Sequence, residues 1–309
     1  MRWKIFYIFL GFFIGVVVLF GFMLFGIENP FHLSLVKKVI DYTVARTLPE
    51  TFCALLVGQD SIKPVRSDTI MLLCINTRSE EVLLFSIPRD TRLSIPGVGY
   101  DKVNHAYARG GITLLRKTIE EALGMEIPYF VEVNYDGFEK VIDALGGVEI
   151  EVEKPLRYVD KAQDLYINIA AGKQVLNGEK ALQYVRFRHD PLGDIGRIKR
   201  QQSFIKALLA KMDDPSLLMN VSSILEGLRK SVNTNIPSED VVQLAMWFRG
   251  LKEKKLATET MPGEPTYVNG VSFWEPDLMA SQKLIQNFLS REKESLGEQS
   301  DYSGDKKSS

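Results

Sequence analysis

The sequence is poor in several features that define whole classes of protein. It has two cysteines in 309 residues, which excludes a small domain held together by disulfides. It has no excess of positive charge, because 38 Lys and Arg against 39 Asp and Glu give a net charge of −1, whereas a general nucleic-acid binder needs a strongly basic domain. It also contains no Walker loop, no HExxH and no G-x-S-x-G motif. What remains, 45 % apolar and 25 % charged, is the composition of a globular protein and excludes wholesale disorder.

A long uncharged stretch lies near the N-terminus. Residues 5–27 carry no charge, and as a helix they would measure about 34 Å, enough to cross the hydrocarbon layer of a bilayer. Arg2 and Lys4 precede this stretch and Glu28 follows it, so the positive-inside rule predicts that residues 1–4 are cytoplasmic. We therefore expect a single-pass protein of the cell membrane whose remaining residues are extracellular and do not meet nucleic acid.

The rest of the chain divides by composition. Residues 28–50 are expected to form a helical linker, residues 51–290 an extracellular domain, and residues 291–309, which are almost free of apolar side chains, a disordered tail. Cys53 and Cys74 both lie in apolar runs of the domain. An exported domain can form a disulfide, but cysteine commonly serves as a small buried hydrophobe, so we favour free core thiols.

Strands and helices alternate through the domain, which predicts a layered α/β fold. Near-continuous apolar runs predict buried strands, and apolar positions at helical spacing predict helices between them. The expected strands are 52–57, 70–76, 82–87, 130–133 and 148–152, with strand and turn over 165–177. The expected helices are 112–123, 136–145, 179–183, 194–212, 217–230 and 238–249.

The most informative segment is residues 184–202, which is basic in a nearly neutral chain. We expect Arg186 and Arg188 to point to the same face of an extended strand, since they are two residues apart. Two parallel guanidinium forks suit an oxyanion such as a phosphate. The alternative is a solvated strand with surface ion pairs, and it is weakened because further arginines follow at helical spacing.

The helix expected after this segment adds polar groups of its own. Arg197 and Gln201 are four residues apart, so they share a helix face close to the positive end of the helix dipole, where anions bind. Asp194 is placed to cap the start of this helix. Arg200 lies farther from the apolar stripe, and we expect it to be solvated.

Carboxylates and cations also flank the expected strands. Arg89 and Asp90 follow the third strand, and strand ends are where α/β folds build their sites. Asp60 follows the first strand and Asp68 precedes the second, where turn formation explains each equally well. Two carboxylates among several arginines fit Mg²⁺ that bridges protein and phosphate oxygens. Lys102 is a further candidate for a phosphate contact.

Seven of these motifs occur in an order and at spacings that resemble the LytR-CpsA-Psr family over about residues 52–212. The resemblance implies a three-layer α/β/α domain with a central mixed β-sheet and an apolar tunnel for a lipid tail. It implies a ligase that moves a glycopolymer, such as teichoic acid or capsular polysaccharide, from a polyprenyl-pyrophosphate carrier to peptidoglycan, forms a phosphodiester and releases polyprenyl phosphate. The motifs are Gly58-Gln59-Asp60, Arg66-Ser67-Asp68-Thr69, Ile87-Pro88-Arg89-Asp90, Lys102-Val103-Asn104-His105-Ala106, Gly146-Gly147-Val148, Arg186-Phe187-Arg188 and Asp194-x-x-Arg197-x-x-Arg200-Gln201-Gln202.

The resemblance also implies roles for individual residues. Asp60 and Asp68 are the carboxylates linked to Mg²⁺, the expected cofactor. Arg89 and Arg188 are expected to be essential for transfer, and Asp90 is the candidate that accepts the proton of the attacking hydroxyl. Phosphoryl-type transfer needs mainly alignment and neutralisation of charge, which arginine, lysine and Mg²⁺ supply. The expected contacts of the pyrophosphate and head group are Arg89, Lys102, Arg186, Arg188, Arg197 and Gln201.

Two other functions are compatible with the same features. A hydrolase would let water attack and cleave polyprenyl pyrophosphates. A non-catalytic protein would bind anionic wall polymer or sense wall lipids. The expected cytoplasmic segment of four residues argues against signalling without a partner, and carboxylates among the arginines would repel a polyanion unless a metal intervened.

Overall fold

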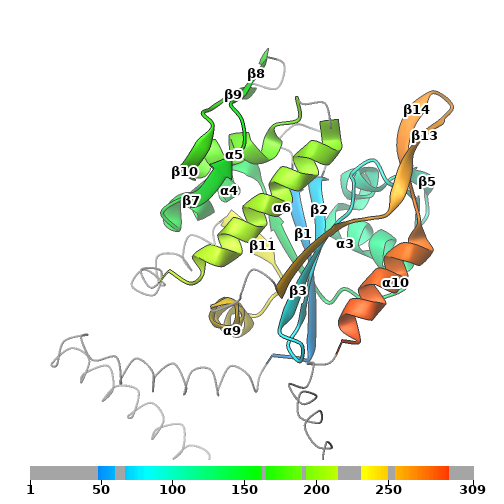
Figure 1. Ribbon diagram of the computed structural model, residues 1–309. Helices are drawn as coiled ribbons and strands as arrows, with labels where there is room; N and C mark the ends of the chain where they lie inside the picture. The colour runs from blue at the N-terminus through cyan, green and yellow to red at the C-terminus, as the bar shows by residue number, and fades with distance from the viewer. Residues whose placement is uncertain are drawn as a thin grey trace, which may run out of the picture. The chain divides into compact units, whose positions relative to one another are not determined.

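The apolar runs of the sequence pair into one central mixed sheet. A computed structural model of the chain describes residues 48–59, 67–161, 165–189, 193–214, 231–249 and 255–291. The sheet has six strands in the order β11-β6-β1-β2-β3-β12 (Figure 1). Strand β1 pairs antiparallel with β2 and parallel with β6. The strands are β1 (Thr51–Gln59), β2 (Ser67–Asn76), β3 (Glu81–Ser86), β6 (Tyr129–Val133), β11 (Val232–Thr234) and β12 (Leu256–Thr260).

The two faces of the sheet bury different residues because side chains alternate along a strand. Leu55 and Leu72 lie on one face, in a core cluster that the helices α3 and α10 complete. Leu56 and Met71 lie on the other face and line a cavity that α4, α5 and α6 enclose. Helices therefore cover both faces of a mixed sheet (Figure 1), as predicted. The helices are α3 (Val103–Leu123), α4 (Tyr135–Ala144), α5 (Gly178–Arg186), α6 (Gly193–Lys211), α9 (Ser238–Phe248) and α10 (Leu278–Leu289).

Helix α3 begins nine residues before the predicted start at residue 112, and a glycine pair interrupts it. Gly110 and Gly111 have non-helical backbone angles, and the φ of Gly111 is 61°, a value that favours glycine. The helix ends at Gly124 in the left-handed conformation, whose N–H donates to the carbonyl of Glu120, as the sequence predicts. Two helical pieces therefore meet at the glycines.

Four two-stranded sheets surround the central sheet. The strand and turn predicted over 165–177 are confirmed as β9 and β10, and the strand predicted over 148–152 is β7. The hairpins β4–β5 and β13–β14 were not predicted, because they are short and half-exposed and carry no continuous apolar run. The four pairs are β4 (Arg92–Ile95) with β5 (Gly99–Lys102), β7 (Val148–Val152) with β10 (Gly172–Leu176), β8 (Leu156–Asp160) with β9 (Leu165–Ile169), and β13 (Gly263–Val268) with β14 (Val271–Pro276).

A second core cluster positions α5 and α6. Ile150 of β7 and Ile167 of β9 pack with Tyr184 of α5 and Phe204 of α6, and all four are at most 4 % exposed. Burial raises the pKa of the Tyr184 hydroxyl to about 12. The sheets β7–β10 and β8–β9 therefore support the two helices that carry Arg186 and Arg197.

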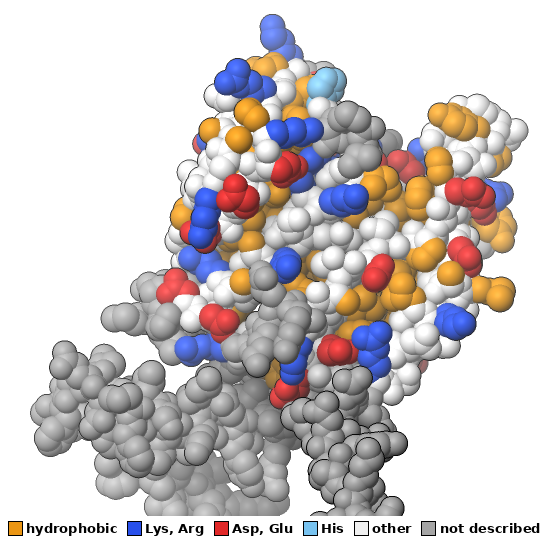
Figure 2. Space-filling view, in the orientation of Figure 1, with side chains coloured by type: hydrophobic (Ala, Val, Ile, Leu, Met, Phe, Trp, Pro, Cys, Tyr) orange, Lys and Arg blue, Asp and Glu red, His pale blue; other side chains and the backbone are white. Residues whose placement is uncertain are grey.

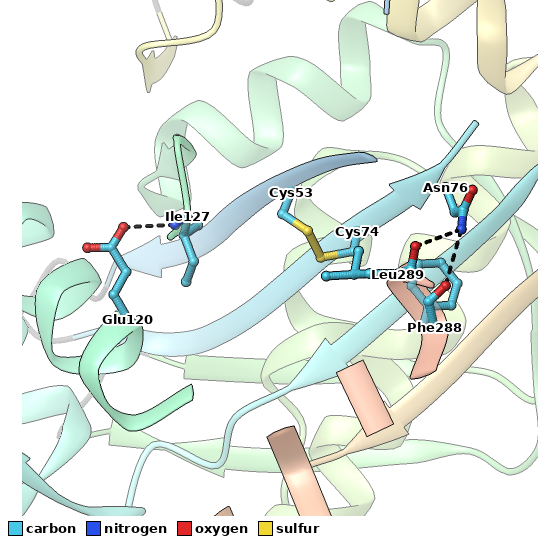
Figure 3. The surroundings of a disulfide bond; sticks show 7 residues. All are labelled: Cys53, Cys74, Asn76, Glu120, Ile127, Phe288 and Leu289. Atoms are coloured by element: carbon cyan, nitrogen blue, oxygen red, sulfur yellow. Dashed lines mark hydrogen bonds between the residues drawn. A yellow bond between two sulfur atoms is a disulfide. The ribbon is translucent and has the colours of Figure 1, made fainter. Parts of the chain in front are cut away.

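The expectation of free core thiols is wrong, because Cys53 and Cys74 form a disulfide (Figure 3). The antiparallel register of β1 and β2 places the two residues directly opposite each other, with their Cα atoms 4.2 Å apart. Both side chains are nearly fully buried beneath α3 and α10. The side chain of Asn76, also on β2, donates to the carbonyls of Phe288 and Leu289 at 3.2 and 3.3 Å and fixes the end of α10 (Figure 3).

Several predicted segments lie outside the described residues. They are the apolar stretch 5–27, most of the linker 28–50, the helix 217–230 and the tail beyond Arg291. Within the part of the chain that the structure does describe, no helix is both long and apolar enough to cross a membrane.

The disulfide is expected to stabilise the domain. The double variant Cys53→Ala/Cys74→Ala removes a cross-link that closes a loop of 21 residues, which lowers the free energy of unfolding by about 3 kcal/mol. Urea unfolding of both proteins with and without a thiol reductant measures this difference. The reductant should destabilise the wild type and leave the double variant unchanged, and equal midpoints for the oxidised wild type and the variant would contradict the expectation.

Candidate active site

An apolar cavity of about 310 Å³ lies between the central sheet and α4, α5 and α6. Its aliphatic and aromatic lining comes from β1, β2 and β6 on one side and from the three helices on the other. Its polar lining gathers where β1 and β6 end and β2 begins. The polar and charged residues that line it include Asp68, Thr69, Asn134, Tyr135, Arg186, Arg188, Arg197 and Gln201.

The register of β2 and β3 brings Asp68 and Arg89 together. Met71 pairs with Ser86, and the N–H of Ile87 continues the ladder by donating to the carbonyl of Ile70 at 2.9 Å. The same register places Asp68 opposite Arg89, whose Nη1 donates to Asp68 Oδ1 at 2.6 Å. Each side chain is about a quarter exposed, so the ion pair is partly shielded from water.

Asp68 accepts hydrogen bonds from three side chains, two at its carboxylate and one at its backbone carbonyl. Besides Arg89, the hydroxyl of Tyr135 donates to Asp68 Oδ2 at 3.2 Å, and Arg197 Nη2 donates to the backbone carbonyl of Asp68 at 3.4 Å. Burial would raise the pKa of the Asp68 carboxyl, but the charges of Arg89 and Arg197 outweigh it and hold the pKa below its ordinary value. Asp68 is therefore ionised at neutral pH.

Helix α6 presents Arg197 and Gln201 to the cavity, as their spacing predicts. Gln201 Nε2 donates to Thr69 Oγ1 at 2.9 Å, which ties α6 to the start of β2. The side chain of Arg197 is 5 % exposed and pairs with Asp194 at 2.7 Å. Burial lowers the pKa of Arg197, and the positive charges of Arg89 and Arg188 act in the same direction. Asp194 lies inside the first turn and acts as this counter-ion, whereas the sequence analysis placed it as the cap before the helix.

The prediction of a strand through Arg186 and Arg188 is wrong. Arg186 is the last residue of α5, a helix that begins after the cap Asn177 and continues three residues past the predicted end. Phe187 then turns the backbone to an extended conformation and buries its ring. Both guanidinium groups nevertheless reach the same cavity, because the helix end and the following turn replace the alternation of a strand.

The expectation that Arg200 is solvated is also wrong. Its side chain is 4 % exposed, and its Nη2 donates to the carbonyl of Phe187 at 2.7 Å. Its guanidinium also lies 4.9 Å from the centre of the Phe187 ring. Arg200 therefore holds the segment that carries Arg188.

Asp90 and Lys102 form a second ion pair beside Arg89, outside the lining of the cavity. Lys102 Nζ lies 2.7 Å from Asp90 Oδ1, and Arg89 Nε lies 3.8 Å from Asp90 Oδ2. The Asp90 side chain is 34 % exposed, more than that of Asp68. A continuous row of alternating charges thus runs from Asp68 through Arg89 and Asp90 to Lys102.

Of the two predicted Mg²⁺ ligands, the structure describes only Asp68. Asp60 lies outside the described residues, whereas Asp68 offers an ionised carboxylate at the cavity. The described part of the chain holds no cluster of three or more His, Cys, Asp or Glu side chains that would bind a metal by themselves. Mg²⁺ that takes most of its ligands from water and substrate phosphate needs one or two carboxylates, which Asp68 fits.

The two histidines near the site are engaged elsewhere. His105 Nδ1 lies 2.8 Å from Asp101 Oδ1. The ring of His189 stacks on that of Tyr158, with ring centres 5.0 Å apart.

Sequence reasoning missed Tyr135. Its hydroxyl contacts Asp68, and the guanidinium of Arg186 lies 4.4 Å from the centre of its ring. A signal was present, since Tyr135 follows the predicted strand 130–133. Because β6 runs parallel to β1, residues after that strand emerge at the same edge as Gly58, next to Asp68.

Comparisons with known proteins cover most of the chain. The LytR_cpsA_psr family model matches residues 35–290. Regulatory protein MsrR of Staphylococcus aureus (strain COL) is 37 % identical over 217 residues, which are 69 % of this chain and 65 % of MsrR, so this chain spans slightly less than two thirds of that relative. Polyisoprenyl-teichoic acid–peptidoglycan teichoic acid transferase TagU of Enterococcus faecalis is 34 % identical over 78 % of this chain and 80 % of TagU.

Solved structures share the fold. The crystal structure of B. subtilis TagV matches with a TM-score of 0.69 and 30 % identity over 78 % of this chain and 98 % of TagV. A structure of TagT bound to LIIa-WTA matches with a TM-score of 0.66 and 30 % identity over 80 % of this chain and 95 % of TagT.

The lowered pKa of Asp68 predicts a pH-dependent contribution to stability. The ionised carboxylate stabilises the folded state above the unfolded pKa of about 3.9, and this contribution is lost as pH falls through the lower folded pKa. Asp68→Asn should therefore destabilise the protein at pH 7, and the difference should shrink below about pH 4. Urea unfolding at both pH values measures this difference in stability. The control is Asp136→Asn, which removes an exposed ion pair with Lys140 on a helix. An equal loss of stability of Asp68→Asn at both pH values would contradict the lowered pKa of Asp68.

Proposed function

Because this chain belongs to the LytR_cpsA_psr family, we propose that it is a phosphotransferase that moves an anionic wall glycopolymer from a polyprenyl-pyrophosphate carrier to peptidoglycan. The product would be a phosphodiester, and polyprenyl phosphate would be released. The transferase named TagU and the structure of TagT bound to LIIa-WTA support this class of reaction. The observation that carries the proposal is the gathering of Arg186, Arg188 and Arg197 at the polar end of a largely apolar cavity.

The cavity suits the lipid tail of such a carrier. Its lining is dominated by Leu, Val, Ile, Met and Phe side chains, and its volume is at the lower end of the range of about 300–1,000 Å³ that small-molecule sites occupy. Each tail carbon that enters contributes about 0.8 kcal/mol of hydrophobic free energy. A cavity of this size would hold the first part of a polyprenyl chain, next to the phosphates.

The polar side of the cavity suits the pyrophosphate. Arg186, Arg188 and Arg197 present guanidinium groups that bind phosphate oxygens with two parallel hydrogen bonds. Among the described residues the buried Nε of Arg197 has no hydrogen-bond partner, so this arginine has a donor left for a ligand. Arg89 stands on the other side of Asp68 and adds charge where the transferred phosphate would lie.

The transfer step follows from this placement. A hydroxyl oxygen of peptidoglycan forms a bond to the phosphorus nearer the glycan, and the bond from that phosphorus to the bridging oxygen breaks, so the polyprenyl phosphate leaves with the electron pair. The arginines neutralise the charge that develops on the departing phosphate. Asp90, whose carboxylate is partly exposed beside Arg89, is our candidate for the group that accepts the hydroxyl proton.

Mg²⁺ belongs to the proposal as the expected cofactor. Asp68, with Asp60 as its proposed partner, would hold the ion against phosphate oxygens of the carrier. Bound there, Mg²⁺ would neutralise phosphate charge and orient the pyrophosphate. The ion pair between Asp68 and Arg89 would keep both charges at the site when the ion is absent.

The membrane anchor is the remaining part of the proposal. A span over residues 5–27 would hold the domain at the outer surface of the cell membrane, where the lipid tail of the carrier resides. Since no ATP is expected there, the free energy for transfer would come from the pyrophosphate bond of the carrier.

One incubation separates this function from its two rivals. The full chain is mixed with lipid-linked glycan, Mg²⁺ and peptidoglycan. Glycan fixed covalently to the peptidoglycan identifies the transferase, free glycan phosphate identifies a hydrolase, and retention of the glycan without turnover identifies a binding protein.

Removal of one arginine from the site should abolish transfer. Arg89→Ala and Arg188→Ala each remove a donor to a phosphate that gains charge in the reaction, so we expect the rate to fall about 10²-fold or more while the fold is kept. Arg78→Ala, which removes an exposed pair with Glu50 at the opposite end of the sheet, is the matched control. Near-wild-type transfer by both site variants would refute the assignment.

The role of Asp68 predicts a loss of metal dependence. In Asp68→Ala, transfer should fall to background, and the residual rate should no longer respond to Mg²⁺ or to its removal with EDTA. Binding of Mn²⁺, followed by its paramagnetic signal, should weaken in the same variant without any turnover. Unchanged Mn²⁺ binding would exclude Asp68 as a ligand.

A further inference from the structure

A second surface adjoins the charged row that ends at Lys102, and the hairpin β4–β5 forms one side of it. Leu93 and Ile95 of this hairpin are buried in the core. Because side chains alternate, Arg92 and its pairing partner Lys102 point to the opposite, outer face, together with Tyr100. Tyr100 is 69 % exposed, and the guanidinium of Arg92 lies 4.7 Å from the centre of its ring.

The hairpin β13–β14 forms the other side. One of its faces meets the outer face of β4–β5, since Glu275 pairs with Arg92 at 3.3 Å and the ring centre of Phe273 lies 5.6 Å from Lys102 Nζ. Tyr267 lies on the opposite face, because it pairs with Ser272, the neighbour of Phe273. The hairpin projects beyond the body of the domain next to β5 (Figure 1), and hydrophobic, acidic and basic side chains lie close together around it (Figure 2).

This surface is fixed to the loop that carries the reacting groups. The N–H of Trp274 donates to the carbonyl of Asp90 at 3.0 Å, and its indole Nε1 donates to the carbonyl of Met261 at 3.2 Å. The side chain of Asp90 pairs with Lys102 at one end of the surface. These hydrogen bonds hold the hairpin next to Asp90.

We propose that the face formed by Tyr100, Phe273, Arg92 and Glu275 binds the sugar rings of the acceptor glycan strand. The inference rests on the proposed function and names where its acceptor lies. The cavity takes the donor from one side of the row Asp68–Arg89–Asp90–Lys102, so the attacking hydroxyl must arrive in line from the other side, where this face lies. Asp90, at the boundary of the two, meets the incoming hydroxyl.

The chemistry of the face favours a saccharide over other occupants. An exposed aromatic ring offers a flat apolar surface for the C–H face of a sugar, and an adjacent Arg–Glu pair offers donors and acceptors for its hydroxyl and amide groups. A protein interface of ordinary size would need a larger apolar centre than one exposed tyrosine and one half-buried phenylalanine.

The experiment measures acceptor binding without transfer. The full chain in detergent is sedimented with insoluble peptidoglycan stripped of attached polymer, in the absence of donor. Tyr100→Ala and Phe273→Ala should each weaken binding about three- to tenfold, and Tyr100→Phe should restore most of it because the ring remains. Tyr267→Ala, which removes a ring that is 75 % exposed on the other face of the same hairpin, should bind as the wild type does.

Kinetics separate this inference from the proposed function. In the transfer assay the two variants should raise the KM for peptidoglycan by the same factor and leave the affinity for the lipid-linked donor unchanged. If the wild type transfers no glycan but Tyr100→Ala still loses peptidoglycan binding, the surface stands and the transferase assignment fails. If the wild type transfers glycan and neither variant changes binding or KM, the surface is wrong and the function stands.

A different occupant would give a different result. If the variants leave glycan binding unchanged but convert a dimer in analytical ultracentrifugation to a monomer, the face joins two copies of the chain and the inference is overturned. Thermal unfolding of each variant serves as the control for folding, and Tyr100→Ala is expected to be neutral there because its side chain is largely exposed.

Discussion

The ion pair between Asp68 and Arg89 is the interaction on which the arrangement of the site depends. It joins the start of β2 to the residues that follow β3. Asp68 also accepts hydrogen bonds from the Tyr135 hydroxyl and, at its backbone carbonyl, from Arg197. Without this carboxylate, the positive charges of Arg89 and Arg197 would lose the counter-ion that hydrogen-bonds Arg89 and would depend on Asp194 and Asp90 alone. Removing one partner of a partly buried ion pair leaves the other charge less well compensated, so the carboxylate of Asp68 helps to hold Arg89 beside the cavity.

The site is assembled from stretches that are far apart in the sequence, and each is fixed by ordinary packing. The register of β2 and β3 determines the positions of Asp68 and Arg89. The buried core beneath α5 and α6 determines the positions of the other arginines. Arg200 links the two helices through the carbonyl and ring of Phe187. Arg200 does not line the cavity, yet it fixes the segment that carries Arg188, so the basic segment contains arginines that line the cavity and one that supports them.

Much of this could be predicted from local patterns, and the errors have physical causes. The apolar runs of β1, β2 and β3 are sufficient to predict these strands. The spacing of Arg197 and Gln201 is sufficient to predict that they share one face of a helix. The disulfide depends on the register between two strands, which a single sequence does not reveal. The helical end at Arg186 and the burial of Arg200 depend on tertiary packing, which overrides local preference. Tyr135 and the β13–β14 hairpin were missed because their roles arise only when distant segments meet at one sheet edge.

The glycine pair Gly110–Gly111 divides α3 into two parts that make different contacts. Before the break, the backbone N–H groups of Val103 and Asn104 bond to the loop of Arg89 and Thr91, whereas after it Leu115 and Ile119 are buried against the sheet. Exchanging residues 92–109 between related chains would therefore alter the surroundings of the Arg89–Thr91 loop and also part of the interior, because Leu93, Ile95 and Val103 belong to the core cluster. A chimaera that keeps the interior intact would exchange only the residues on the outer face of β4–β5, such as Arg92 and Tyr100.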